Sequence, residues 1–130
     1  VAVQKWLHDL VGFKQLSTAD RDNIIGRRLS DNEEFDEAPE SAHVKRSAQE
    51  SFSPPAFMLR KSMPWADFSG EGLIFVAFGS SFYAFDTVMN QMLGTHDGIK
   101  DGLFEISRCL GTGYYWCPPM ANNKLDLSAI

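Results

Sequence analysis

The clearest structural signal in the sequence is a run of large apolar residues, Gly72-Leu73-Ile74-Phe75-Val76-Ala77-Phe78-Gly79. Apolar residues recur at every second position in this run and in much of the stretch from Ala56 to Met63. A two-residue period is typical of a packed β-sheet, because successive side chains of a strand point to opposite faces. Residues 56–63 and 72–79 are therefore predicted to form two strands, with Leu73, Phe75 and Ala77 on one face.

Two helices and a further strand are predicted around these strands. Residues 1–9 are expected to form a strand. A helix is expected to begin at Ser17-Thr18-Ala19-Asp20, because Ser or Thr can cap the exposed amides and Asp suits the positive helix end. Residues 82–93 carry apolar side chains at helical spacing, and Gly94 ends that helix.

The last predicted element is a hairpin. Residues 102–107 are expected to pair with residues 113–117 across Gly111-Thr112, before Pro118-Pro119 stops the strand. The order is then strand, helix, strand, strand, helix and hairpin, which is the ferredoxin-like βαββαβ plan. We expect a single α+β domain over residues 1–130, with an antiparallel sheet and helices on one face.

Composition excludes several classes of function. The net charge of −5 leaves no basic footprint for nucleic acid, and no apolar run approaches the roughly 18 residues of a membrane span. Cys109 and Cys117 fit neither a CxxC redox motif nor a CxxCH heme-attachment motif. Free thiols in a cytoplasmic protein are expected, although two cysteines on one hairpin could also reach each other. The chain does not begin with Met, which indicates a fragment, a processed chain or a chosen boundary.

Two side chains stand out as candidates for chemistry, although each has an ordinary structural interpretation. His43 lies in Ser41-Ala42-His43-Val44, whereas His8 and His96 have no comparable context, and no HExxH motif or Cys/His cluster indicates zinc. A lone histidine in a loop is most often a surface or hydrogen-bonded residue. Arg60 lies among apolar strand residues, where an arginine usually extends its charged end to solvent.

Several linked motifs resemble, in their order, the C-terminal half of the dye-decolorizing peroxidases of bacterial class B, or type P. These motifs are Pro39-Glu40-Ser41-Ala42-His43-Val44-Lys45-Arg46, Leu59-Arg60-Lys61-Ser62-Met63-Pro64-Trp65 and the run of residues 72–79. Further matches are Gly26-Arg27, Asp97-Gly98 and Thr112-Gly113-Tyr114-Tyr115-Trp116. The resemblance covers nearly the whole chain and implies that the protein binds heme b (iron protoporphyrin IX).

The resemblance assigns roles to individual residues. His43 is the implied axial ligand of the heme iron, and Glu34 is its implied acidic partner, with Glu33 and Asp31 as competing positions. Arg60 is implied to lie over the opposite heme face, where a guanidinium stabilises negative charge on a departing oxygen. Ser62, two residues further along the strand, points to the same face and could bind water or peroxide.

Apolar residues are implied to form the heme walls. Leu73 and Phe75 are expected on the Arg60 side of the heme, and Met89, Met92 and Leu93 on the His43 side. Ordinary core packing explains the same residues equally well, since a heme would be one of the contents of the core.

The chain departs from the family in one respect. The family motif Gly-x-x-Asp-Gly, whose acid transfers a proton of peroxide in many members, is absent. The chain is also expected to lack the N-terminal half of the family fold, so the apolar sheet face of Leu73 and Phe75 would need that half or another chain to cover it. The implied partners are heme, hydrogen peroxide and a small aromatic reductant such as a phenol or dye, in a homo-oligomer without nucleic acid or membrane.

Three functions are consistent with these features. The first is a heme peroxidase, present as its heme-binding half. The second is a non-catalytic heme-binding or heme-handling module, which the missing acid favours. The third is a dimeric ferredoxin-like domain that holds an apolar ligand without a cofactor. A heme absorption band excludes the third function, and turnover with peroxide separates the first from the second.

Overall fold

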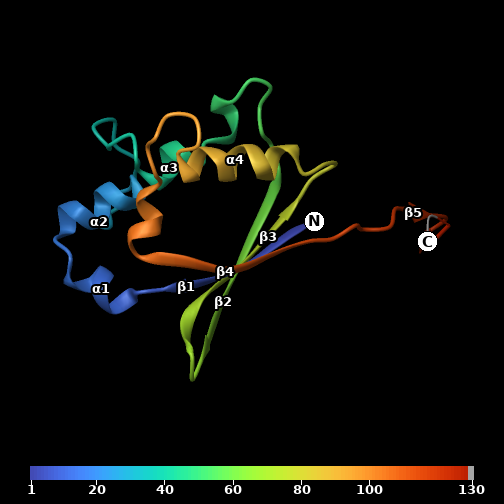
Figure 1. The fold of residues 1–130 in the computed structure, drawn as a ribbon, viewed down its shortest axis with the longest axis horizontal. Helices are drawn as coiled ribbons and strands as arrows, with labels where there is room; N and C mark the ends of the chain where they lie inside the picture. The colour runs from blue at the N-terminus through green and yellow to red at the C-terminus, as the bar shows by residue number, and fades with distance from the viewer. Residues whose placement is uncertain (129–130) are drawn as a thin grey trace.

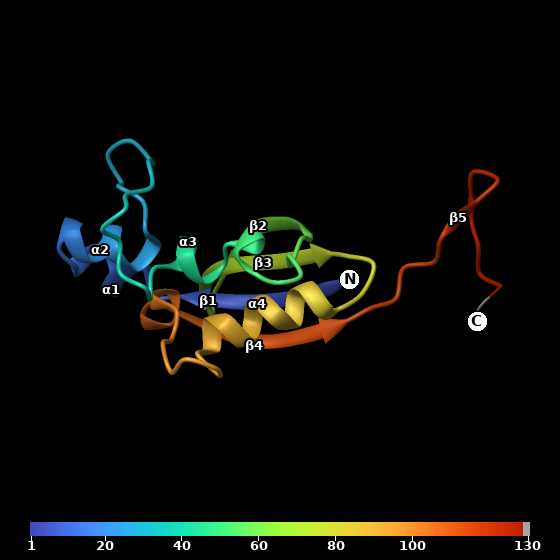
Figure 2. The same ribbon diagram turned by 90° about the horizontal axis from the view of Figure 1, so that it is seen from above.

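The computed structural model describes residues 1–128, which form a four-stranded antiparallel sheet with helices on one face (Figures 1 and 2). The strands lie in the order β2-β3-β1-β4. Their bounds are β1 (Ala2–His8), β2 (Leu59–Asp67), β3 (Gly70–Phe78) and β4 (Ser107–Tyr114). This order confirms the ferredoxin-like α+β fold predicted from the sequence.

The helices connect the strands and supply the cover of one sheet face. They are α1 (Leu10–Gln15), α2 (Thr18–Ile25), α3 (His43–Arg46) and α4 (Tyr83–Leu93), with short 3-10 helices η1 (Gln49–Ser51) and η2 (Gly102–Glu105). Ser17 caps α2 as expected, because its side chain accepts a hydrogen bond from the amide of Asp20. Figure 2 shows α4 lying across the sheet, with α3 near its C-terminal end.

The strand register decides which side chains face α4. Gln4 lies opposite Phe75, and Trp6 lies opposite Leu73. Ser62 also lies opposite Phe75 on the other side of β3. Directly opposed residues of antiparallel strands share a face, so these side chains and the buried α4 residues form one interior.

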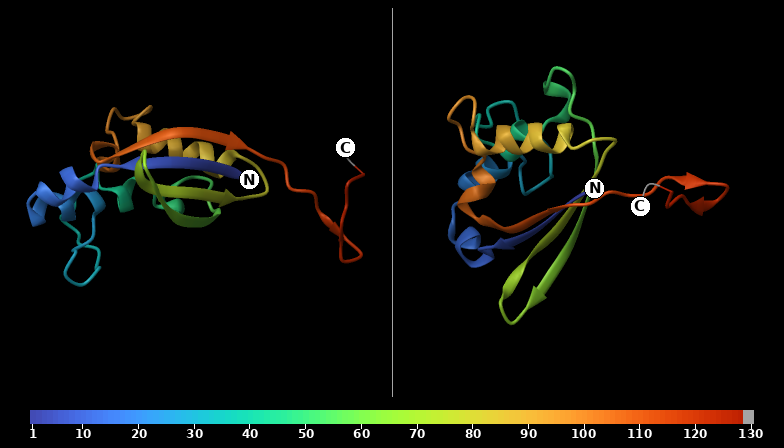
Figure 3. Two further views of the ribbon diagram at one scale, coloured as in Figure 1. Left: turned by 90° about the horizontal axis from the view of Figure 1, so that it is seen from below. Right: turned by 45° about the vertical axis from the view of Figure 1, so that its right-hand side comes forward.

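The other sheet face carries no helix among residues 1–128. Seen from below in Figure 3 (left), the strands lie in front of α4 and nothing covers them. Leu59, Met63 and Leu110 on this outer face are about half exposed or more. The sheet is therefore buried on one side only. The expectation that the face of Leu73 and Phe75 lacks a cover is wrong, because these two residues pack against the core that includes α4.

The predicted C-terminal hairpin is wrong. β4 runs straight through Gly111-Thr112, because residues 107–114 pair with β1 in the centre of the sheet, with a shift in register between Lys5 and Trp6. Residues 102–105 form η2 instead of a strand. Cys109 and Cys117 are both free thiols, as expected, and they are not cross-strand neighbours.

Beyond β4 the chain extends away from the sheet and ends in a small hairpin. Its strands are β5 (Met120–Ala121) and β6 (Lys124–Leu125), and Figures 1 and 3 show them well apart from the other elements. None of the helices within residues 1–128 has both the length and the apolar character of a membrane-spanning segment.

Candidate functional site

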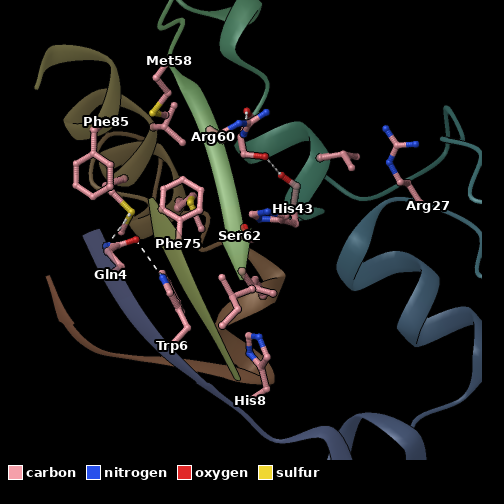
Figure 4. Close-up of a pocket in the computed structure, with 17 residues that line it drawn as sticks. Gln4, Trp6, His8, Arg27, His43, Met58, Arg60, Ser62, Phe75 and Phe85 are labelled. Carbon is pink, nitrogen blue, oxygen red and sulfur yellow. Dashed lines mark hydrogen bonds between the residues drawn. The ribbon is translucent and has the colours of Figure 1, made fainter. Parts of the chain in front are cut away.

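A cavity of about 370 Å³ lies between the sheet and the helices α3 and α4 (Figure 4). This volume is within the range of small-molecule sites in proteins. We call it the main cavity. The strands β1, β2 and β3 form one side of the cavity, and the segment after α2, α3 with its C-terminal end, α4 and η2 face them. The lining residues are Gln4, Trp6, His8, Arg27, His43, Val44, Ser47, Met58, Arg60, Ser62, Leu73, Phe75, Phe85, Val88, Met89, Met92 and Leu103.

His43 enters the main cavity from the first position of α3 and is bound to a buried carboxylate. Its Nδ1 lies 2.8 Å from Oδ2 of Asp101, whose residue is only 1% exposed. The other oxygen of Asp101 accepts a bond from the amide of Leu103 and caps η2. With Nδ1 engaged, Nε2 of His43 is the nitrogen left for a metal ion, and a carboxylate behind the ring raises its basicity.

The expected partnership of Glu34 with His43 is wrong. Glu34 forms an ion pair with Arg27 and an isolated β-bridge with the same residue, and its side chain is 58% exposed. The competing position Asp31 is bound to Arg28. Asp101 was missed because it lies 58 residues from His43, and its only sequence signal is that Asp before Gly can cap a turn.

Arg46 holds α3, and with it His43, against the end of α4. Its buried guanidinium donates to the carbonyl of Gln91 and to both carboxylate oxygens of Asp97, at 2.6 and 2.9 Å. These bonds lower the pKa of Asp97 to about 2, with a smaller contribution from the amide of Ile99. A cation at a helix C-terminus also suits the free carbonyls there.

Two further contacts fix the position of α3: a backbone hydrogen bond and a close approach at Gly26. The amide of Gly102 donates to the carbonyl of Ser41 at 2.7 Å, which joins the segment carrying Asp101 to the segment carrying His43. Gly26 ends α2 with φ of 86°, and a Cβ there would lie 2.3 Å from the side chain of Val44. A side chain at position 26 would therefore push α2 away from α3.

Arg60 and Ser62 face the main cavity from β2, as the sequence predicted. Arg60 Nη1 donates to the carbonyl of the buried Ser47 at 3.2 Å, whereas Arg60 and Ser62 are themselves exposed. Figure 4 shows His43 facing this strand from α3. A histidine of α3 and an arginine of β2 thus line the same cavity.

The apolar walls agree with the expected set except at one position. Leu73, Phe75, Met89 and Met92 all line the main cavity. Leu93 does not line it and is 47% exposed, because one step along α4 from Met92 turns the side chain about 100° around the helix.

Gln4 and Trp6 of β1 also line the main cavity and were not among the residues predicted for the site. Trp6 Nε1 donates to Oε1 of Gln4 at 3.0 Å, and Gln4 Nε2 donates to Oγ1 of Thr112 at 3.1 Å. Alternation along β1 was a usable signal, since it places Gln4, Trp6 and His8 on one face.

The mouth of the main cavity is polar. Arg27, Val44, Ser47 and Arg60 also line a shallower hollow of about 260 Å³, together with Glu34, Lys45, Ala48 and Glu50. Two guanidinium groups at the entrance favour a ligand with carboxylates at one edge. Within residues 1–128 no three His, Cys, Asp or Glu side chains converge on one metal position, so a metal in the main cavity would have His43 as its one protein ligand from this set. The arrangement suits a metal held mainly by an organic group rather than by protein side chains.

Known proteins share both sequence and fold with this chain. Residues 1–122 match the model of the C-terminal domain of Dyp-type peroxidases. The dye-decolorizing peroxidase of Mycolicibacterium paratuberculosis is 27% identical over 124 residues, which are 91% of this chain and 35% of that protein. The chain therefore spans about a third of the length of this relative.

Solved structures share the fold. A dye-decolorizing protein from V. cholerae superposes with a TM-score of 0.75 at 29% identity, over 85% of this chain and 38% of that one. A DypB variant from Rhodococcus jostii RHA1, solved in complex with heme, has a TM-score of 0.74 at 24% identity, over 85% of this chain and 38% of that one.

Proposed function

The chain belongs to the Dyp-type peroxidase family as its C-terminal domain, and from this premise we propose that it is the heme-binding half of a heme peroxidase. The substrates would be hydrogen peroxide and a small aromatic reductant such as a phenol or dye. The observation that carries the proposal is that two groups line one cavity, His43 backed by Asp101 and Arg60 beside Ser62. Peroxidases need both a basic axial ligand and a fixed cation.

The residues present fit heme b. His43 Nε2 would bind the iron, and Asp101 would keep the imidazole oriented and electron-rich. Leu73 and Phe75 would contact the ring system from the strands, and Met89 and Met92 from α4. The guanidinium group of Arg27 at the mouth, which is ion-paired with Glu34, would lie near a propionate of the ring.

Bound heme supplies the redox chemistry, and the protein supplies positioning and charge. Arg60 would hold its positive charge where an oxygen of peroxide becomes negative as the O–O bond breaks. Ser62 can donate to or accept a hydrogen bond from bound peroxide. The apolar walls exclude water and strengthen both interactions.

A covering partner is part of the proposal. The chain spans about 35% of its curated relative, and the outer sheet face exposes Leu59, Met63 and Leu110. We infer that the N-terminal half of the family fold, or another chain, covers this face in a cytoplasmic homo-oligomer. Burial of exposed apolar area drives such an association.

A non-catalytic heme-binding module is the second candidate. It is favoured by one observation, that no Asp or Glu side chain of residues 1–128 lines the main cavity. Without an acid the transfer of a peroxide proton loses its usual carrier. The two candidates share the heme site and differ only in turnover.

The test compares this chain with a version that carries the N-terminal half of the family fold. Both are loaded with hemin, matched in heme content, and assayed with peroxide and a phenolic reductant. We expect a heme Soret band in both and stronger turnover in the extended version. Turnover absent from both, with the band intact, would favour the heme-binding module. Equal turnover from the monomeric 130-residue chain would contradict the need for a cover.

A further inference from the structure

His8 stands where the main cavity meets a more open hollow. It is the last residue of β1, on the face that carries Trp6. His8, Ser62 and Leu73 line both the main cavity and a second hollow of about 490 Å³. We call this second space the β2–β3 hollow; its lining also includes Leu10, Pro64, Trp65, Ala66, Glu71 and Gly72. Figure 4 shows the His8 ring at the edge of the main cavity, apart from His43.

The orientation of the His8 ring leaves one nitrogen free. Nδ1 lies 2.7 Å from Oγ of Ser107, which is buried opposite it on β4. Among residues 1–128 no hydrogen bond is found for Nε2. The serine hydroxyl can donate to Nδ1 or accept from it, so Nε2 can either take up a proton or release one.

The surroundings of His8 favour the neutral ring. Burial lowers its pKa below the ordinary value of 6.5, and the Glu71 carboxylate of β3 opposes this to a smaller extent. The other charged groups around the ring line a third hollow: Asp9 next in the chain, Glu105 of η2 and Arg108 of β4. The ring is therefore an unprotonated base at pH 7.

No other group on the strand side of the main cavity can accept a proton at this pH. The guanidinium of Arg60 carries only hydrogen-bond donors and has no acceptor site for a proton. The hydroxyl of Ser62 is not a base near neutrality. The amide oxygen of Gln4 is not basic and already accepts a bond from Trp6. His43, the remaining titratable base, lies on the opposite wall and is bound to Asp101.

We propose that His8 accepts the proton of a small weak acid that reaches the main cavity through the β2–β3 hollow. The inference rests on the proposed function, which makes hydrogen peroxide the relevant acid. In this step the O–H bond of the acid breaks, an N–H bond forms at Nε2, and the anion remains in the main cavity. The same proton is then available to the oxygen that departs as water. His8 would thus carry out the proton transfer that the acid of the Gly-x-x-Asp-Gly motif carries out in many members of the family.

Cyanide binding tests this step without turnover. Hydrogen cyanide is a weak acid that binds heme iron as its anion, so its proton needs an acceptor. In the hemin-loaded chain, His8→Gln should slow cyanide association at pH 7 by about 10²-fold, the lower end for general-base catalysis. The exposed His96 provides a matched control, and His96→Gln should equal the unmodified chain.

The outcomes separate the two proposals. An intact Soret band with an unchanged cyanide rate in His8→Gln overturns the role of His8 and leaves the heme site standing. Failure of the unmodified chain to form a Soret band overturns the proposed function, and the inference with it.

A second variant decides the matter if His8→Gln does not fold. Glu71 is exposed, and Glu71→Gln removes the carboxylate that raises the pKa of His8. The cyanide rate depends on the neutral ring, so its rise with pH should move to lower pH in Glu71→Gln. The His8 ring signals in an NMR titration of the heme-free chain should move in the same direction. A rate profile that stays in place contradicts the proposal.

Discussion

The two walls of the main cavity are built differently. On the α3 wall, His43 is bound to the fully buried Asp101, and the buried Arg46 ties the helix to Gln91 and Asp97. On the β2 wall, Arg60 is exposed and makes one hydrogen bond of 3.2 Å, to the carbonyl of Ser47. Charge-assisted hydrogen bonds fix His43 and Arg46 on the α3 wall, whereas Arg60 on the β2 wall donates to one neutral carbonyl.

The difference follows from the place of each wall in the fold. α3 packs between α2, α4 and the segment before η2, so its polar groups are enclosed and must be paired. β2 is an edge strand, with β3 on one side and no strand on the other. The contacts within the chain therefore fix the geometry of His43, the proposed iron ligand, whereas the geometry of Arg60 depends on what binds beside it.

Removal of the axial ligand should have the largest effect. His43→Ala is expected to abolish the Soret band or leave heme loosely bound, since no second ligand converges on the site within residues 1–128. Absorption spectra after hemin titration measure this. His96→Ala should retain the band, and an unchanged five-coordinate histidine spectrum in His43→Ala would sink the assignment.

The β2 wall should affect rate rather than binding. Arg60→Leu is expected to slow the reaction with peroxide by about 10²- to 10³-fold, the usual loss for a charge-stabilising donor, while heme stays bound. Stopped-flow measurement in the N-terminally extended protein gives the rate. Lys61→Leu is the matched control, because Lys61 lies on the outer face of the same strand. Rates equal within error would make Arg60 a structural residue.

The partner of the axial ligand should have an intermediate effect. Asp101→Asn is expected to weaken heme binding by about 10- to 100-fold, as is typical when a group behind a metal ligand is altered. The rate of heme transfer to excess apomyoglobin reports the change. Glu34→Gln should have no effect, since Glu34 pairs with Arg27. Weaker heme binding in Glu34→Gln, with Asp101→Asn unchanged, would identify Glu34 rather than Asp101 as the partner of His43.

The clamp on α3 should produce the smallest effect, seen in stability at acid pH. The pKa of Asp97 is about 2 in the folded chain, below its ordinary value of 3.8, because Arg46 stabilises the carboxylate. A lowered pKa stabilises the fold above about pH 4, and this contribution is lost as pH falls toward 2.

Thermal unfolding between pH 5 and pH 2 measures the contribution of the clamp. Asp97→Asn should lower the midpoint at pH 5 and reduce its dependence on pH in this range. Glu40→Gln, which alters an exposed pair with Lys45, should behave like the unmodified chain. Identical curves for Asp97→Asn and the unmodified chain would mean that the clamp does not stabilise α3.

Local pattern in the sequence was enough for the strands and the main helix. The two-residue period predicted β3 and the shared face of Leu73 and Phe75, and the helical period predicted α4 with Met89 and Met92. The same reasoning failed at Leu93, because a helix stripe inferred from spacing has uncertain edges. It failed also at Gly111-Thr112, where pairing with β1 outweighs the preference of glycine for turns.

By itself the sequence determined the order of β1, α2, β2, β3 and α4, the candidacy of His43, and the common face of Arg60 and Ser62. These follow from periods of two and 3.6 residues and from linked motifs, which are properties of neighbouring residues. Only the tertiary structure decided that Asp101 is bound to His43 and that His8 lies between two hollows. Such contacts depend on how distant segments pack, and a carboxylate becomes the partner of a histidine only where folding buries the two side by side.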